Sequence, residues 1–184
     1  MDAFENLVAM LLKRDGYWTS IGVKVELTKA EKRKVGRPSS PRWEIDVVAY
    51  KGSTNELLAV ECKSFLDSRG VQFHGGGFEP PERYKLFTDS RLQKTVLGRL
   101  RKQLVASGAC RRAPKVTLAL AAGKIASNTP VDELRAQFAK RGWRLIDPDW
   151  IYERLKTASA SGYENDMACV VSKLILRRNG QREE

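Results

Sequence analysis

Three charged residues in two neighbouring segments have the types and the spacing of a cation site: Asp46, Glu61 and Lys63. Segments 43–50 and 56–63 are predicted to be strands, because the sequence Gly-Ser-Thr-Asn at 52–55 has the composition of a hairpin turn between them. The chemistry of the three residues therefore depends on how the two strands face each other.

The second strand is expected to carry Glu61 and Lys63 on one face. Successive side chains of a strand point to opposite faces, so Leu58, Val60 and Cys62 would occupy the other face. Lys63 would then lie beside the Glu61 carboxylate, where it can orient or deprotonate an attacking water and neutralise charge that builds on a phosphate.

The first strand is expected to place Asp46 opposite Glu61, with Cβ atoms about 5 Å apart, if the turn is symmetric about its two central residues. Asp46 would point away from Ile45, Val47 and Ala49. Two carboxylates that close repel each other unless a cation lies between them. Magnesium suits such a pair, because it takes one or two carboxylates and completes its shell with water and phosphate. The alternative is a pair of cross-strand charges satisfied by neighbouring lysines.

The surrounding elements are predicted from apolar periodicity and from capping and turn residues. We expect an α/β fold with a central mixed sheet flanked by helices. The helices are expected at 2–14, 91–106, 130–141, 147–158 and 163–177, and further strands at 17–27, 116–122 and 143–146. Residues 28–42 are expected to form a basic loop, and residues 65–90, rich in glycine and proline, a long loop or insertion. One domain would span residues 1–158, and residues 159–184 would form a C-terminal helical extension packed on or near it.

Composition indicates a polyanionic partner. The 184 residues carry 33 basic and 22 acidic side chains, a net charge of +11. Nucleic acid is the expected partner and an anionic membrane surface the weaker alternative. The longest apolar run, residues 116–122, is much shorter than the roughly 20 residues of a membrane-spanning helix.

Cysteine and histidine usage narrows the chemistry further. Cys62, Cys110 and Cys169 are an odd number without C-x-x-C spacing, which favours a reducing cytoplasmic setting and no zinc site. His74 is the only histidine, which excludes histidine-based triads and sites with several histidine ligands. Acidic residues near the start of the chain argue against a signal peptide.

Basic residues concentrate in two segments that are expected to contact nucleic acid through phosphates, which makes binding depend on salt. The candidates are Lys32, Arg33, Lys34, Arg37 and Arg42 in the loop, and Arg91, Lys94, Arg99 and Lys102 on the helix. Residues 34–38 are also similar to the core of an AT-hook, with a valine in place of its first arginine. For the helix, the alternative is an ordinary solvated face.

The hairpin resembles the PD-(D/E)XK nuclease superfamily, whose core is restriction endonuclease-like. Asp46 is followed fifteen residues later by Glu61-Cys62-Lys63, behind an amphipathic helix. The order of elements over residues 2–122 is similar to the superfamily's helix, three strands, helix and strand. The Mrr-like restriction endonucleases and the archaeal Holliday-junction resolvases are the branches it resembles most.

The resemblance implies roles for particular residues. Asp46, Glu61 and the backbone carbonyl of Cys62 would hold the metal, and Lys63 would serve the attacking water. A glutamate on the first helix joins the site in several branches, which implies Glu5. A glutamine on the helix after the third strand joins it in others; Gln103 is the candidate, with Gln93 the weaker choice.

The sequence and the resemblance together predict a DNA endonuclease that hydrolyses phosphodiester bonds with Mg²⁺ or Mn²⁺. The alternative is a catalytically inactive DNA-binding protein that keeps the nuclease fold, and a small basic RNA-associated factor is a third reading. Resolvase-like members work as symmetric dimers, so a homodimer through the final helix stays open.

Overall fold

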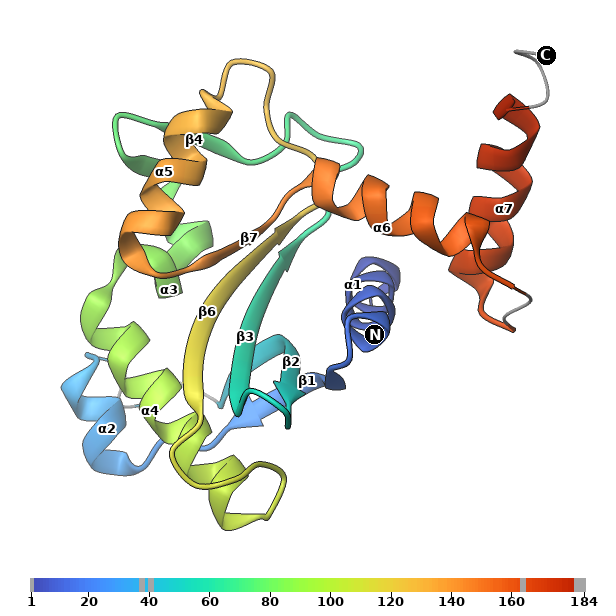
Figure 1. Cartoon of the computed structure of the whole chain (residues 1–184). Coiled ribbons are helices and arrows are strands. Elements are labelled where there is room, and N and C mark those ends of the chain that lie inside the picture. The colour runs from blue at the N-terminus through green and yellow to red at the C-terminus, as the bar shows by residue number, and fades with distance from the viewer. Residues whose placement is uncertain (1, 37–38, 40–41, 163–164, 181–184) are drawn as a thin grey trace.

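The computed structural model describes residues 2–36, 39, 42–162 and 165–180 of the chain. Five strands form one sheet in the order β1-β2-β3-β6-β7 (Figure 1). They are β1 (Trp18–Val25), β2 (Trp43–Lys51), β3 (Glu56–Lys63), β6 (Lys115–Ala122) and β7 (Arg144–Ile146). The first three pair antiparallel, whereas β3 with β6 and β6 with β7 pair in parallel. The predicted α/β fold with a mixed sheet is confirmed.

Helices cover both faces of this sheet (Figure 1). One face carries α1 (Ala3–Arg14) and α6 (Pro148–Ala160), whose apolar residues pack with those of β2 and β3. The other face carries α3 (Lys85–Thr88), α4 (Ser90–Ala106) and α5 (Val131–Arg141). The short helix α2 (Lys29–Lys34) lies beside α4, away from the sheet. The result is three layers, with the sheet in the middle.

The first helix forms where its periodicity predicts. Asp2 caps it by accepting a hydrogen bond from the backbone N–H of Phe4 at 2.7 Å, and Lys13 and Arg14 lie in the last turn, where positive charge is favourable. Leu11 and Leu12 are fully buried against the sheet. Burial of each such side chain contributes about 1.5–3 kcal/mol, so the helix is held mainly by its apolar face.

Two segments expected to be loops contain regular structure. Residues 65–90 include a small hairpin of β4 (Gln72–His74) and β5 (Gly77–Glu79), then the 3₁₀ helix η1 (Pro81–Tyr84) and α3. Aromatic rings hold this segment against α5: the Phe78 ring stacks on Tyr84 at 4.3 Å, and Phe87 lies 5.7 Å from Phe138. The expectation of a basic loop over residues 28–42 is also wrong in part, because residues 29–34 form the helix α2. Its capping box joins Thr28 and Glu31.

Thr129 lies just before α5 but does not cap it. Its hydroxyl accepts a hydrogen bond from the N–H of Phe73 at 3.1 Å and donates to the carbonyl of Val71 at 3.2 Å. Pro130 takes the capping position of α5 without a side-chain hydrogen bond. Thr129 therefore fastens the β4 segment to the body of the domain.

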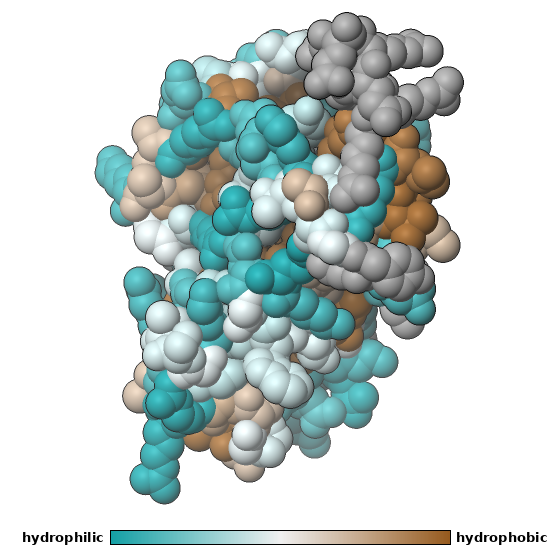
Figure 2. All heavy atoms as spheres, turned by 45° about the vertical axis from the view of Figure 1, so that its right-hand side comes forward, coloured by the Kyte–Doolittle hydropathy of each residue, from teal (hydrophilic) through white to brown (hydrophobic). Residues whose placement is uncertain are grey.

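The C-terminal part of the described chain is helical, as expected. Helix α7 (Met167–Gly180) packs mainly on α6, and the boundary expected after residue 158 falls inside the last turn of α6. Apolar side chains on α7 are exposed, and Figure 2 brings this side forward, with apolar surface in brown beside hydrophilic side chains. The exposed apolar residues of α7 are Met167, Val170, Val171, Leu174 and Ile175. Among the described residues no helix has the length and apolarity needed to span a membrane.

The carboxyl ends of β3 and β6 approach unusually closely at Gly123. Its N–H donates to the carbonyl of Lys63 at 2.9 Å. A Cβ atom added at Gly123 would lie 2.5 Å from the carbonyl oxygen of Ser64 and 3.2 Å from the Phe4 ring. Glycine is therefore needed where β6 ends, and it fixes the position of the last residues of β3.

We predict that Gly123→Ala lowers the free energy of unfolding by about 1–3 kcal/mol, because the clash is with backbone that cannot rotate away. Gly98→Ala in α4 is the matched control. A Cβ there meets no heavy atom within 4 Å, so alanine should stabilise the helix by about 0.5–1 kcal/mol. Equilibrium unfolding in urea measures both changes. A Gly123→Ala protein as stable as the unsubstituted chain would contradict the close approach.

Candidate active site

The β2–β3 hairpin has the predicted register. Val47 pairs with Val60, and the pairs continue to Lys51 with Glu56. The ladder ends at the Val47 pair, so the predicted direct pair of Asp46 with Glu61 is not part of it, and Asp46 is the first residue beyond. Its Oδ2 atom accepts a hydrogen bond from the backbone N–H of Cys62 at 2.7 Å. Asp46 thus reaches across to β3 at the residue next to Glu61.

A kink where β1 pairs with β2 changes the direction of Asp46. Pairing of β1 with β2 omits Gly22 and Asp46, although the pairs on either side of them are formed. Gly22 has φ +64°, a left-handed conformation that favours glycine. Ile45 packs with the α4 side of the sheet, whereas Val47 packs with the α1 side. The expectation that Ile45 shares a face with Val47 and Ala49 is wrong, because the kink breaks the alternation at Asp46.

On β3 the predicted alternation is confirmed. Leu58, Val60 and Cys62 pack with the α1-side core. Glu61 and Lys63 alternate with them and belong to the opposite face, which α4 and the β4–β5 segment cover. The strand therefore delivers a carboxylate and an ammonium group to the same face at the carboxyl edge of the sheet.

Glu61 is half-buried, and one of its two carboxylate oxygens lacks a partner. Its Oε1 atom is inaccessible to solvent and forms no hydrogen bond. Burial, and then the negative charge of Asp46, raise the pKa of Glu61 to about 7, while Lys63 acts in the opposite direction. A buried acceptor of this kind costs free energy unless a proton or a cation satisfies it.

The same buried environment shifts the pKa values of Asp46 and Cys62. Burial raises the pKa of Asp46, and the hydrogen bond from Cys62 and the charge of Lys63 reduce this rise. Burial and the nearby carboxylates also raise the pKa of the Cys62 thiol. The thiol therefore stays protonated at neutral pH, so oxygen atoms are the ligands that this edge can offer a metal.

Glu5 approaches the site from α1. It lies in the first turn, half-buried, and its pKa is raised by partial burial and then by Asp46. Asp46 therefore lies near Glu5 as well as Glu61. Within the described residues, no three Asp, Glu, His or Cys side chains are arranged to hold a metal ion. Asp46 and Glu61 still fit magnesium by donor chemistry, because this ion needs only one or two carboxylates.

The glutamine implied by the resemblance is engaged elsewhere. Gln103 donates through Nε2 to the carbonyl of Lys24 at 2.9 Å and accepts from the N–H of Glu26 at 3.2 Å. It ties α4 to the end of β1, which is a structural role. Gln93, the weaker choice, lies in the first part of α4 with a buried Nε2 that has no hydrogen-bond partner.

The basic residues named from the sequence divide into two groups. Lys34, Arg91, Lys94, Arg99 and Lys102 line one groove of about 320 Å³ between α2 and α4. Arg101 lines it too and was missed, although it lies at helical spacing from Lys94 and Gly98. Arg33 is exposed and Lys32 half-buried on α2, Arg42 pairs with Glu26 at 3.2 Å, and Arg37 lies outside the described residues.

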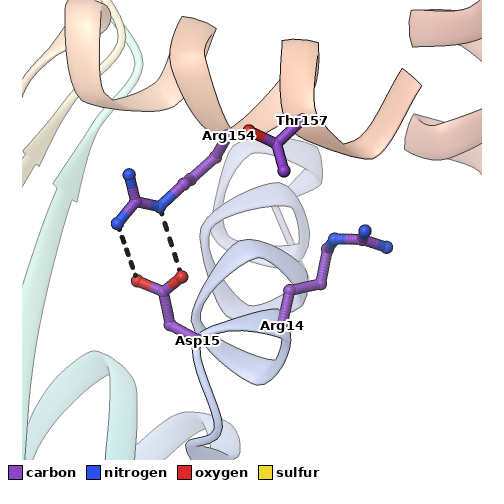
Figure 3. Close-up of a pocket in the computed structure, with 4 residues that line it drawn as sticks. All are labelled: Arg14, Asp15, Arg154 and Thr157. Carbon is purple, nitrogen blue, oxygen red and sulfur yellow. Dashed lines mark hydrogen bonds and ion pairs between the residues drawn. The ribbon is translucent and has the colours of Figure 1, made fainter. Parts of the chain in front are cut away.

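A separate cavity of about 550 Å³ lies at the carboxyl end of α1, the end opposite to Glu5 (Figure 3). Arg14, Asp15, Arg154 and Thr157 line it. Asp15 accepts hydrogen bonds from Arg154 at 3.2 and 3.3 Å, which joins α1 to α6. The carboxylate neutralises the arginine, so this cavity has the character of a helix–helix junction.

Comparison of the chain with protein-family models, curated proteins and solved structures found no match.

We predict that Glu61 makes the metal-free protein less stable as pH rises. The folded chain keeps a proton on Glu61 up to about pH 7, whereas the unfolded chain releases it near pH 4.5. The free energy of unfolding contributed by this group is therefore fully present below pH 4.5, falls as pH rises towards 7, and levels off above. Glu61→Gln should stabilise the protein by about 1–3 kcal/mol at pH 8 and leave it unchanged at pH 4.

Urea unfolding at the two pH values in the presence of a chelator measures this difference. Glu153→Gln on the exposed face of α6 is the control for loss of one negative charge. A Glu61→Gln protein no more stable than the parent at pH 8 would show that Glu61 is not held in an unfavourable site.

Proposed function

We propose that the chain is a metal-dependent endonuclease that hydrolyses phosphodiester bonds of DNA. The observation that carries the proposal is the buried Oε1 of Glu61, which has no hydrogen-bond partner and lies in the field of Asp46 and Lys63. Groups held in such unfavourable states cluster at functional sites.

The donor set supports Mg²⁺ or Mn²⁺ as cofactor. Asp46 and Glu61, with the backbone carbonyl of Cys62, would hold the ion. A bound divalent ion supplies positive charge that polarises the phosphate and stabilises its transition state. By holding the ion, the two carboxylates would also fix the position of the scissile phosphate, so that the water can attack it in line.

Lys63 supplies the second function of the site. Its ammonium group projects on the same face as Glu61. There it orients the attacking water and neutralises charge that develops on the phosphate. Glu5 approaches from α1 and adds negative charge near Asp46, which strengthens the site for a cation.

The fold supports the same proposal at the level of architecture. Along the chain come α1, the strands β1, β2 and β3, the helix α4 and then β6 parallel to β3, with α2 and the segment from β4 to α3 inserted between them. This order resembles the restriction endonuclease-like core of the PD-(D/E)XK superfamily, with Asp46 and Glu61-Cys62-Lys63 in the expected elements. Membership of that superfamily is part of the proposal.

We predict that the purified protein cleaves plasmid or branched DNA at low salt with Mg²⁺ or Mn²⁺. Glu61→Ala and Lys63→Ala should each reduce the rate by at least about 100-fold, because each removes a group from the reacting centre. Gel assays of nicked and linear product measure the rate. Glu153→Gln should cleave like the unsubstituted protein, and cleavage that survives Glu61→Ala would exclude the assigned site.

An inactive nuclease-fold protein that only binds DNA is the second candidate. Two observations favour it: Asp46 already accepts a hydrogen bond from Cys62, and the described residues hold no three-ligand cluster. Metal binding itself separates the two candidates.

We predict that Mn²⁺ raises the thermal midpoint of the unsubstituted protein at pH 8, and raises that of Glu61→Gln much less. A ligand at 100 times its dissociation constant adds about 2.7 kcal/mol to the stability of the folded state. Differential scanning fluorimetry with and without Mn²⁺ measures the shift. Equal shifts for the two proteins would favour the inactive candidate.

A further inference from the structure

The groove between α2 and α4 collects positive charge that the carboxylate site does not use. Its lining includes Lys34 from α2 and five cations from α4: Arg91, Lys94, Arg99, Arg101 and Lys102. Arg99 is neutralised, because the Glu31 carboxylate accepts from its Nε at 2.9 and 3.2 Å. Within the part of the chain that the structure describes, no carboxylate pairs with the other five.

The groove is formed before any ligand binds. Glu31 closes the capping box of α2 and at the same time binds Arg99, so it fixes α2 against α4. Val35, directly after α2, packs with the apolar core on the α4 side of the sheet. Lys34 is thereby held across from the α4 cations, although 60 residues separate it from Lys94.

Gly98 at the groove points to a ligand. It lies in the middle of the 17-residue helix α4, where glycine weakens a helix. Packing does not require it, because a Cβ at this position would meet no heavy atom within 4 Å. A helix surface left bare among cations lets a ligand approach the backbone closely.

Helix α4 runs antiparallel to β3, so its amino end points towards the end of the sheet that carries the carboxylates. Asn55 in the β2–β3 turn donates to the carbonyls of Arg112 and Ala113, just beyond the carboxyl end of α4. The amino end of α4 therefore lies towards the opposite end of β3, where Glu61 and Lys63 lie. From Arg91 to Lys102 the helix rises about 16 Å, which equals about five base-pair steps measured along the axis of a DNA duplex.

We propose that this groove binds the sugar–phosphate backbone of duplex DNA on one side of the cleaved bond, with the backbone seated over Gly98. The inference rests on the proposed function, because it assigns to the groove the part of the substrate beyond the reacting phosphate. The substrate is then a duplex that continues several base pairs past the cleavage point. Very short duplexes would not reach Lys102.

Gly98→Leu is the decisive variant. A leucine fills the groove without disturbing the fold, because its Cβ enters open space and leucine favours helix. Ala136→Leu, at an exposed position of α5, is the control for added bulk. Binding of a fluorescently labelled 30-base-pair duplex is measured by anisotropy in a chelator, so that cleavage does not interfere.

We expect Gly98→Leu to bind at least about tenfold more weakly and Ala136→Leu to bind like the parent. Lys102→Ala should lower the slope of log affinity against log salt by about 1, and Lys140→Ala on α5 should leave it unchanged. Gly98→Leu with parental affinity and a parental thermal midpoint would overturn the groove assignment.

Glu61→Gln in the same assay separates this inference from the proposed function. We expect it to bind like the parent while it loses cleavage. If Gly98→Leu weakens DNA binding but the parent protein never cleaves DNA, the proposed nuclease activity is wrong and the groove assignment stands. If Gly98→Leu cleaves long and short duplexes as fast as the parent does, the groove assignment is wrong and the proposed nuclease activity stands.

Discussion

The parallel pairing of β3 with β6 is the constraint on which the other elements depend. It runs from Glu56 with Lys115 to Lys63 with Ala122, so the two strands are paired over their full lengths. Parallel neighbours cannot be joined by a tight turn, and the chain between them must cross one face of the sheet. Here it supplies the β4–β5 segment, α3 and α4. The same pairing brings two carboxyl ends together, and Gly123 allows their backbones to meet.

The polar residues at the carboxyl end of β3 follow a run of fully buried residues. Leu57, Leu58, Ala59 and Val60 have no solvent exposure, and Glu61 follows them directly. An apolar residue at 61 would continue the core. Burial of the carboxylate instead costs free energy of folding, and the packing of the rest of the sheet offsets this cost. A site of this kind has its geometry fixed by packing before a ligand arrives, which limits the reorganisation that binding requires.

Much of this arrangement follows from the sequence alone, because long periodic segments determine it. The amphipathic pattern predicts α1 and α4, and the turn residues at 52–55 predict the register that brings Asp46 to β3. Short elements cannot be predicted in this way: β4 and β5 have three residues each, too few to show an alternation of apolar and polar residues. The kink at Gly22 and Asp46 cannot be predicted either, since a single glycine in a strand does not reveal how its neighbour is turned. Gln103 was assigned from family position, whereas its amide is used by the backbone of β1.

Glu31 gives the groove between α2 and α4 an internal anion. Its carboxylate occupies Arg99 as a phosphate oxygen would, and it also closes the cap of a six-residue helix too short to persist by itself. An external phosphate that bound Arg99 would have to displace a carboxylate of like charge, and α2 would then be held by Val35 in the core alone. If the groove binds a polyanion as proposed, Glu31 would compete with it for Arg99 and weaken the binding.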